Sequence, residues 1–423
     1  MRGNGSTNGG VAMVLSSVLV PHCVRGFDSP HVLFDLTIAG AHVLHIRPSA
    51  VQNKQAASGT LVPCLVDIHV HLDKTYVVHE TGAADGDLFR AIDLMAAHRS
   101  RWSEADIGRR MQRAIEEAYR HGTRAMRSHL DWSSMDTPPA LAVFKALRAA
   151  WQGRMALQCV SLTPLDLLDD PLAGQQIART LANINAGAAG ADPSHPADVA
   201  ILGAFVYRNA NMEHKLQQLF DLARQYALQL DFHVDEGLDV DASGLRHIAK
   251  LTLRNNYQGK VTCGHACSLS MQSAAEANQT LALCAQAAIH LVALPATNLY
   301  LQGAWDTTPI ERGITRIKEA AGHGVNLCMA TDNVADGFFP YGSYDLLESF
   351  ALGVQVAHLS PADAWLGSIT TAPARAMALP WDGKIAVGCP ADLVLMAARN
   401  PYELVTAAGR QRTVLRAGVA ITA

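Results

Sequence analysis

Short apolar runs alternate with helix-like segments through most of this chain. Eight runs have the length and the polar borders of buried strands, and the segments between them, such as 105–122 and 212–228, carry apolar residues at helical spacing. This alternation predicts an α/β fold, namely a TIM-type (β/α)8 barrel, with a doubly wound open sheet as the alternative. The strand candidates are CLVDIHV (64–70), TRAMRSHL (123–130), MALQCVSL (155–162), VAILGAFV (199–206), LQLDFHV (228–234), KVTCGHA (260–266), AIHLVAL (288–294) and VNLCMAT (325–331).

The two ends of the chain show a different pattern. Residues 12–60 interrupt short apolar runs with glycine, proline, aspartate and serine, and residues 383–398 and 412–423 repeat this character. Such segments are typical of small sheets. We therefore expect one small β-sandwich domain built from both termini. The expected segments are 1–61 (first part of the small domain), 62–379 (barrel) and 380–423 (second part of the small domain).

Two segments have the composition of unstructured chain or loop. The first ten residues, MRGNGSTNGG, predict disorder, and residues 185–198, NAGAAGADPSHPAD, predict a loop inside the barrel. The apolar run at 11–20 is short and lacks a cleavage motif, so it predicts a first strand instead of a secretion signal.

The overall composition is that of a globular protein with a large core. The 423 residues are 49% hydrophobic, 17% charged and 6% aromatic, with a net charge of −4. This balance argues against a nucleic-acid partner or an anionic membrane surface. No run approaches the roughly 20 apolar residues of a membrane span.

The eight cysteines are scattered through apolar segments, which favours reduced core thiols and a cytoplasmic location. Cys263 and Cys267 flank His265 and permit a second interpretation as structural zinc ligands. No further cysteine pair has the usual spacing for such a site.

Polar residues that could carry chemistry close five of the apolar runs. Catalytic groups of (β/α)8 barrels lie at the carboxyl ends of strands, so these residues are expected to meet. Histidines at positions i and i+2 of one strand also share a face. The five groups are His69 and His71; Arg127, His129 and Asp131; His233 with Glu236; His265; and Asp332.

Three imidazoles and a carboxylate form a suitable ligand set for one divalent ion, Zn²⁺ or Fe²⁺. Such an ion lowers the pKa of bound water toward roughly 7, and a nearby carboxylic acid can move the proton released. Glu236 is the natural proton shuttle. His265 can orient the water and polarise the substrate, and Asp332 can bind the metal and accept a proton.

Each of these residues also has a simpler interpretation. A single histidine at a strand end is often a buried or capping residue, Asp332 could cap a helix, and Glu236 could be a solvated loop acid. Their joint occurrence at separate strand ends favours the metal site.

With these motifs collected, the chain resembles the amidohydrolase superfamily, and within it the cytosine deaminase-like branch. The resemblance rests on VDIHVHLDKTY (66–76), HGTRAMRSHLDW (121–132), FHVDEG (232–237), TDNVADGFFPYGSYD (331–345) and GKIAVGCPADLVLM (383–396). The HLDK run also resembles enzymes that remove amines from triazine rings.

The resemblance implies a distorted (β/α)8 barrel with a single metal ion and no carbamylated lysine. It implies that His69, His71, His233 and Asp332 are the ligands. It further implies that Glu236 and His265 act on water and substrate, and that the protein assembles as a homo-oligomer.

The substrate pocket departs from the cytosine pattern. Cytosine deaminases carry a glutamine after the third strand, where this chain has Leu162, Thr163 and Pro164. Proline offers neither an amide side chain nor an N–H, so cytosine itself is not the expected substrate. The expected substrate-binding residues are Lys74, Leu88, Leu162, Pro164, Asn333 and Phe338.

Lys74 has two equally weighted interpretations. It either binds an anionic or carbonyl group of the substrate or is an ordinary surface lysine.

The sequence therefore predicts a metal-dependent hydrolytic deaminase of a small nitrogen heterocycle, acting by attack of metal-bound hydroxide with Glu236 as proton shuttle. The alternatives are a hydrolase of the same superfamily that opens a cyclic amide or releases an N-alkyl amine, and a non-catalytic metal-binding barrel.

Overall fold

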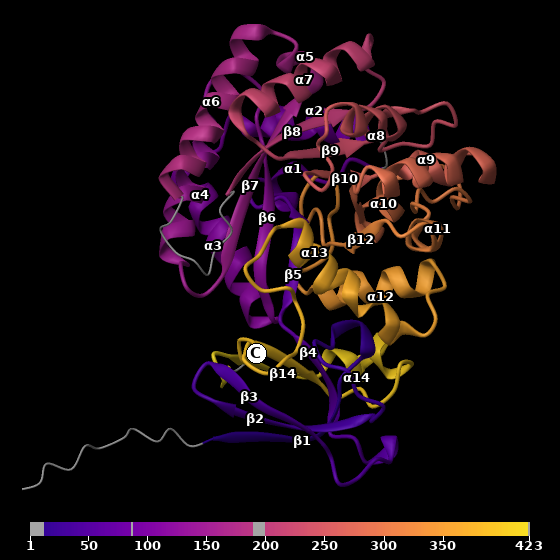
Figure 1. The fold of residues 1–423 in the computed structure, drawn as a ribbon. Coiled ribbons are helices and arrows are strands. Elements are labelled where there is room, and N and C mark those ends of the chain that lie inside the picture. Colours follow the sequence, from indigo (N-terminus) through magenta and orange to yellow (C-terminus); the bar gives the residue numbers. More distant parts are fainter. Residues whose placement is uncertain (1–11, 86–87, 189–198, 422–423) are drawn as a thin grey trace, which may run out of the picture.

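The computed structural model describes residues 12–85, 88–188 and 199–421 (Figure 1). The predicted disorder of the first ten residues lies outside this range, as does most of the predicted loop at 185–198. Residues 185–188 were wrongly assigned to that loop, because they form the last turn of helix α6 (Pro171–Ala188). Asn185 anchors this turn, since its Oδ1 accepts from the backbone N–H groups of Val199 (2.9 Å) and Ala200 (2.8 Å).

Eight parallel strands form the barrel, in the hydrogen-bonded order β12-β11-β10-β9-β8-β7-β6-β5. All eight predicted strands are confirmed. Val70 and Asp332 form a parallel bridge between the two outer strands, which nearly closes the sheet. The strands are β5 (Leu65–Val70), β6 (Thr123–Asp131), β7 (Ala156–Pro164), β8 (Ala200–Val206), β9 (Leu230–Val234), β10 (Val261–His265), β11 (His290–Ala293) and β12 (Asn326–Met329).

Helices follow the strands and cover the outside of the barrel (Figure 1). Helix α3 illustrates why they form: the Ser103 side chain caps its first turn by accepting from the N–H of Asp106, and its apolar face, including Ile107 and Met111, is buried. The helices are α1 (Val78–Thr81), α2 (Leu88–Arg99), α3 (Glu104–Arg120), α4 (Pro139–Ala150), α5 (Leu165–Leu168), α6, α7 (Met212–Tyr226), α8 (Gly244–Arg254), α9 (Ala274–Gln286), α10 (Pro295–Leu301), α11 (Ile317–Gly322), α12 (Leu346–Val356), α13 (Thr371–Ala376) and α14 (Ala407–Arg410), with 3-10 turns η1 (His22–Val24), η2 (Lys54–Ala56), η3 (Cys267–Ser270), η4 (Ala362–Ile369) and η5 (Glu403–Val405).

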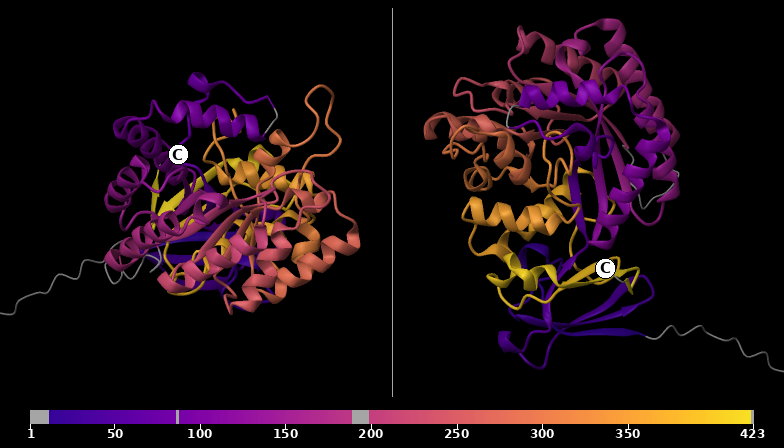
Figure 2. Two further views of the ribbon diagram at one scale, coloured as in Figure 1. Left: turned by 90° about the horizontal axis from the view of Figure 1, so that it is seen from above. Right: turned by 180° about the vertical axis from the view of Figure 1, so that it is seen from behind.

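The remaining strands form one mixed sheet from both ends of the chain, as predicted. Its order is β15-β14-β13-β4-β1-β2-β3, with β1 and β4 parallel and the other neighbours antiparallel. The C-terminal strands lie over the N-terminal ones, and the sheet sits beneath the barrel (Figure 2). The strands are β1 (Met13–Leu19), β2 (Leu33–Ala39), β3 (His42–Pro48), β4 (Gly59–Pro63), β13 (Leu393–Met396), β14 (Arg412–Arg416) and β15 (Val419–Ile421).

The chain passes from the small sheet to the barrel across Cys64, because β4 ends at Pro63 and β5 begins at Leu65. The predicted domain limit after residue 61 falls within β4, and the domain limits stay a prediction. Within the described residues, no helix combines the length and the apolar character needed to cross a membrane.

Candidate metal centre and active site

The four predicted metal ligands come from the ends of three strands, of which β5 and β12 meet at the Val70–Asp332 bridge and β9 lies farther along the sheet. His69 lies in β5 and His71 directly follows it, His233 lies in β9, and Asp332 follows β12. All four side chains are at most 4% exposed. The backbone N–H of Asp332 donates to the carbonyl of His69 (2.9 Å), so the bridge that closes the barrel also brings these ligands together.

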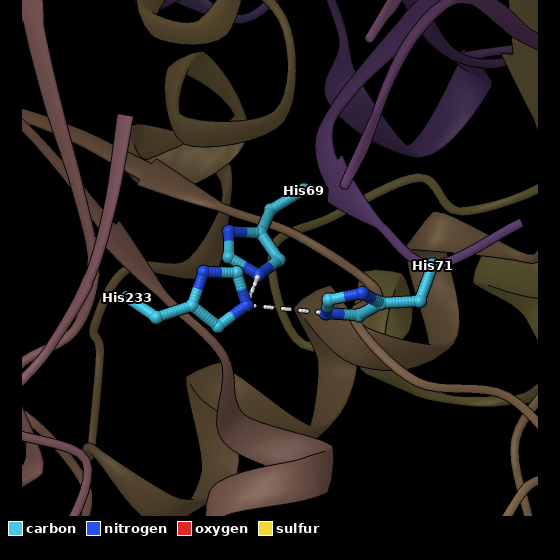
Figure 3. Close-up of side chains that lie close together, drawn as sticks. All are labelled: His69, His71 and His233. Atoms are coloured by element: carbon cyan, nitrogen blue, oxygen red, sulfur yellow. Dashed lines mark hydrogen bonds between the residues drawn. The ribbon is translucent and has the colours of Figure 1, made fainter. Parts of the chain in front are cut away.

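Four side-chain atoms from these residues converge on one point. The Nε2 atom of His233 lies 3.2 Å from that of His69 and 3.3 Å from that of His71 (Figure 3). Asp332 Oδ1 lies 3.4 Å and 3.2 Å from the Nε2 atoms of His69 and His71. A tetrahedral ion with bonds of about 2.0–2.1 Å has ligand atoms about 3.3–3.4 Å apart, so these distances fit a single central ion.

The cluster has too few hydrogen atoms to pair all of its polar atoms, which also favours a bound cation. Three ring nitrogens and a carboxylate oxygen cannot satisfy one another with hydrogen atoms, because a neutral imidazole carries one N–H. Both oxygens of Asp332 are buried, and neither has a hydrogen-bond donor among the described residues. Such orphaned buried acceptors are rare unless an ion completes them. The site fits a divalent metal ion such as zinc.

The electrostatics hold these ligands in the forms that bind a metal. Burial lowers the pKa of His71 to about 3 and that of His233 well below its usual range, so both imidazoles are neutral. Burial alone would raise the pKa of Asp332. The contacts with His69 and His71 outweigh burial and hold that pKa well below its ordinary value, so the aspartate is a carboxylate.

Two strand ends turn sharply at the site. His265 and Asp332 adopt left-handed backbone, with φ of 69° and 68°. Such strain in non-glycine residues concentrates where the chain must direct a side chain. Gly264 precedes His265, and a Cβ at this position would lie 2.8 Å from Cε1 of His69. The glycine therefore makes room for the ring of His69, a predicted ligand.

Glu236 and His265 lie together beside the ligands. Glu236 Oε1 is 3.3 Å from His265 Nδ1, and both side chains are buried. Burial, together with the charge of Asp332, raises the pKa of Glu236 well above its usual value. Burial lowers the pKa of His265 to about 3. A carboxylic acid with a raised pKa beside a neutral imidazole can both accept and return a proton near neutral pH.

A cavity of about 230 Å³ opens onto this group. His71, His233, Glu236 and His265 form its polar end, and apolar side chains form most of the remaining wall. The structure places every predicted substrate-binding residue along this cavity. These residues are Lys74, Leu88, Leu162, Pro164, Asn333 and Phe338.

Lys74 is not a surface residue, because it is only 3% exposed. Its Nζ donates to Asp131 Oδ1 (2.7 Å) and lies 4.8 Å above the ring of Phe338. The other oxygen of Asp131 accepts from Arg99 (2.6 Å). Although burial would lower the pKa of Lys74, the charges of Asp131 and Asp73 outweigh it and raise this pKa. The ammonium therefore stays charged inside the cavity.

Apart from Leu88, the residues of helix α2 that line the cavity were not predicted from the sequence. Its residues Ile92, Met95, Ala96 and Arg99 line the cavity next to Leu88. Their spacing of three to four residues marks one face of the helix. The same spacing also describes a helix packed on a core, so the sequence alone could not assign this face to a cavity.

A second buried polar group lies against the metal ligands. The ring centroid of His129 is 3.9 Å from that of His69, and its Nε2 lies 3.1 Å from Asp231 Oδ1. Arg127 donates to the other oxygen of Asp231 (2.8 Å) and, through Nε, to Gln158 (2.9 Å). Asp231 was missed in the sequence, although it stands two residues before His233 on β9 and so shares its face.

The proposed structural zinc site at Cys263 and Cys267 is not formed. Both thiols are buried and unpaired, and every group of possible metal-binding side chains within the described residues consists of histidine and aspartate only. Burial raises the pKa of both thiols well above the usual value. Protonated thiols in an apolar environment behave as core residues.

Together, the barrel, the buried ligand cluster and the cavity define a metal-dependent hydrolase of the (β/α)8 class. The chain belongs to the amidohydrolase family, since the model of that family matches residues 147–420. It is an enzyme that acts on carbon–nitrogen bonds other than peptide bonds.

Similar proteins support this placement. A pterin deaminase from Rhizobium rhizogenes is 36% identical over 421 residues, covering 96% of this chain and 93% of that protein. The crystal structure of a 5-methylcytosine deaminase from Klebsiella pneumoniae with phosphonocytosine superposes with a TM-score of 0.79 at 24% identity, covering 97% and 98% of the two chains. N-isopropylammelide isopropylaminohydrolase from Burkholderia multivorans gives a TM-score of 0.75 at 23% identity, with 97% of each chain covered. At these identities the two crystal structures support the fold alone.

Proposed function

We propose that this protein is a metal-dependent hydrolytic deaminase of a bicyclic 2-amino-4-oxo heterocycle of the pterin type. The observation that carries the proposal is the cavity in which His71 and His233 of the ligand cluster meet Glu236 and His265. The similarity to a pterin deaminase along nearly the whole chain supports this ring system over others.

The ligand set supports one ion, Zn²⁺ or Fe²⁺, held by His69, His71, His233 and Asp332. A second ion would need Asp231, the carboxylate beside His129. Arg127 already pairs with that carboxylate at 2.8 Å, and a guanidinium is always charged. Binding a cation to Asp231 would take from the buried Arg127 its carboxylate counter-ion, and breaking a buried ion pair is costly.

A bound ion would lower the pKa of water at the end of the cavity. Glu236 would take one proton from the attacking water and pass it to a nitrogen of the substrate ring, while the water oxygen bonds to the ring carbon that carries the amino group. The C–N bond would then break, and ammonia would leave with the second proton of the water. His265 holds the reacting groups in line through a hydrogen bond.

Lys74 serves as the donor to the 4-oxo group of the substrate. An ammonium has three N–H donors and Asp131 accepts one of them, so others remain for a ligand in the cavity. The apolar side chains of Leu88, Leu162 and Phe338 in the lining of the cavity suit an aromatic ring system. Pro164 offers no N–H at the position where a glutamine amide would form hydrogen bonds to a pyrimidine.

The proposal is tested by measuring ammonia released by the zinc-loaded protein from pterins, aminopyrimidines and aminotriazines. We expect ammonia from at least one pterin, with a higher kcat/KM than from cytosine. Absence of ammonia from every compound would contradict the deaminase proposal. Release of isopropylamine from N-isopropylammelide, with no ammonia from the pterins, would favour N-alkyl amine hydrolysis, the activity named for the relative from Burkholderia multivorans.

Assembly and location remain predictions. We retain a homo-oligomer and a cytoplasmic setting, the latter because all eight cysteines are unpaired. The expected partner is the small heterocyclic substrate.

A further inference from the structure

Asn298 is a buried polar residue that contacts the catalytic group without lining the substrate cavity. It lies on α10, directly after β11, and is 1% exposed. Its side-chain nitrogen Nδ2 lies 3.0 Å from Nδ1 of His265. Asn298 is absent from the residues around the cavity, so its contact with the chemistry runs through His265.

The polarity of this contact decides where His265 carries its hydrogen. As the amide of Asn298 is oriented, its nitrogen faces the ring and can only donate, so Nδ1 accepts and a neutral imidazole carries its hydrogen on Nε2. Nε2 of His265 is buried and has no hydrogen-bond partner among the described residues. The ring itself lines the cavity and belongs to the cluster with His69 and Asp332.

Glu236 competes for the same ring nitrogen. Its Oε1 lies 3.3 Å from Nδ1, and as a carboxylate it would draw the hydrogen of His265 to Nδ1. That arrangement would leave Nε2 without a hydrogen and would tie Glu236 to the imidazole. The donor amide of Asn298 opposes it.

We propose that Asn298 is a positioning residue that fixes His265 as the tautomer with hydrogen on Nε2. The Nε2–H group is then a preformed donor for the water or the substrate in the cavity, and Glu236 remains available for proton transfer. Donors oriented before the reaction stabilise developing charge without reorganisation. This inference rests on the proposed function for its kinetic consequence, but the tautomer itself can be observed without turnover.

The tautomer is read from the ¹⁵N spectrum of the zinc-loaded protein labelled with ¹⁵N at histidine and asparagine, with the His265→Gln variant assigning the signals. We expect a pyrrole-like nitrogen at Nε2, a pyridine-like nitrogen at Nδ1, and a coupling across the hydrogen bond from Asn298. In Asn298→Leu the two ring nitrogens exchange character. Hydrogen on Nδ1 in the wild type, or an unchanged tautomer in the variant, would overturn the inference.

Kinetics separate this role from a purely structural one. We expect Asn298→Leu to lower kcat by about tenfold to a hundredfold, as is usual for residues that orient an active-site group, with little change in KM or zinc content. In a His265→Gln background the same substitution should cause no further loss. An equal loss in both backgrounds would contradict action through His265.

A neighbouring residue provides the control. Thr297 lies on the same helix and is fully buried, and Thr297→Val removes a hydroxyl that has no hydrogen-bond partner among the described residues. We expect kcat close to that of the wild type. If the wild type deaminates none of the heterocycles, the proposed function fails, whereas the ¹⁵N spectrum still decides the tautomer.

Discussion

A methyl group added at Gly264 should weaken metal binding although no predicted ligand is itself replaced. The Cβ of Gly264→Ala would lie 2.8 Å from Cε1 and 3.0 Å from Nδ1 of His69. Carbon atoms pack at about 3.5 Å or more, so the ring must move by about 0.7 Å. Metal sites tolerate deviations of about 0.2 Å, so this movement cannot be absorbed by the ligand cluster.

The expected loss of metal affinity is about tenfold to a hundredfold, or about 1.4–2.8 kcal/mol. It is measured by titrating metal-free protein with Zn²⁺ in competition with a chromophoric chelator. The melting temperature of the metal-free protein should change much less, because without the ion the ring is free to shift. Wild-type zinc affinity in Gly264→Ala would refute the assignment of His69 as a ligand held by this packing.

A matched substitution tests the steric reasoning. Gly322 ends helix α11, and an added Cβ there meets no atom within 4 Å. Gly322→Ala makes the same chemical change at a distance from the site, and helices favour alanine over glycine. We expect unchanged zinc affinity. A loss equal to that of Gly264→Ala would point to a general effect of the substitution.

Three further predictions follow from the site. Glu236→Gln should retain the metal and lower kcat by about 10²–10⁴-fold, the usual contribution of a proton carrier. Unchanged turnover would refute that role for Glu236. Replacing Cys263 and Cys267 together with serine should leave the zinc content of the folded protein intact, and loss of one equivalent would revive the cysteine site. Lys74→Met should raise KM for a 4-oxo substrate at least about tenfold, the usual effect of losing a hydrogen bond to a charged group. Asp131 keeps its partner Arg99 in this variant, so the carboxylate is not left unpaired. Unchanged KM would mean that another residue binds the 4-oxo group.

The sequence was sufficient to predict the barrel strands and to propose the ligand cluster, because both have local signals. Each strand is an apolar run ended by a polar residue, as at His233, and the parallel order places all such ends at one edge of the barrel. The His69–His71 pair was interpretable for the same reason, since alternate residues of a strand share a face. These properties depend on a few neighbouring positions.

The features that were missed depend on contacts across long stretches of sequence. Asn298 meets His265 because α10 follows β11, the strand that pairs with β10, and nothing in its own segment marks it. Asp231 looks like any polar strand residue until Arg127 and His129 are seen around it. The last turn of α6 was assigned to a loop because its small residues resemble the loop that follows.

The central claim is that one ion held by three histidines and one aspartate supports deamination in the cavity. The most direct test measures the rate of ammonia release from a pterin while metal-free protein is titrated with Zn²⁺. The account predicts a rate that rises in proportion to zinc and levels off at one equivalent per chain. No ammonia at any zinc level, or a plateau at two equivalents, would contradict it.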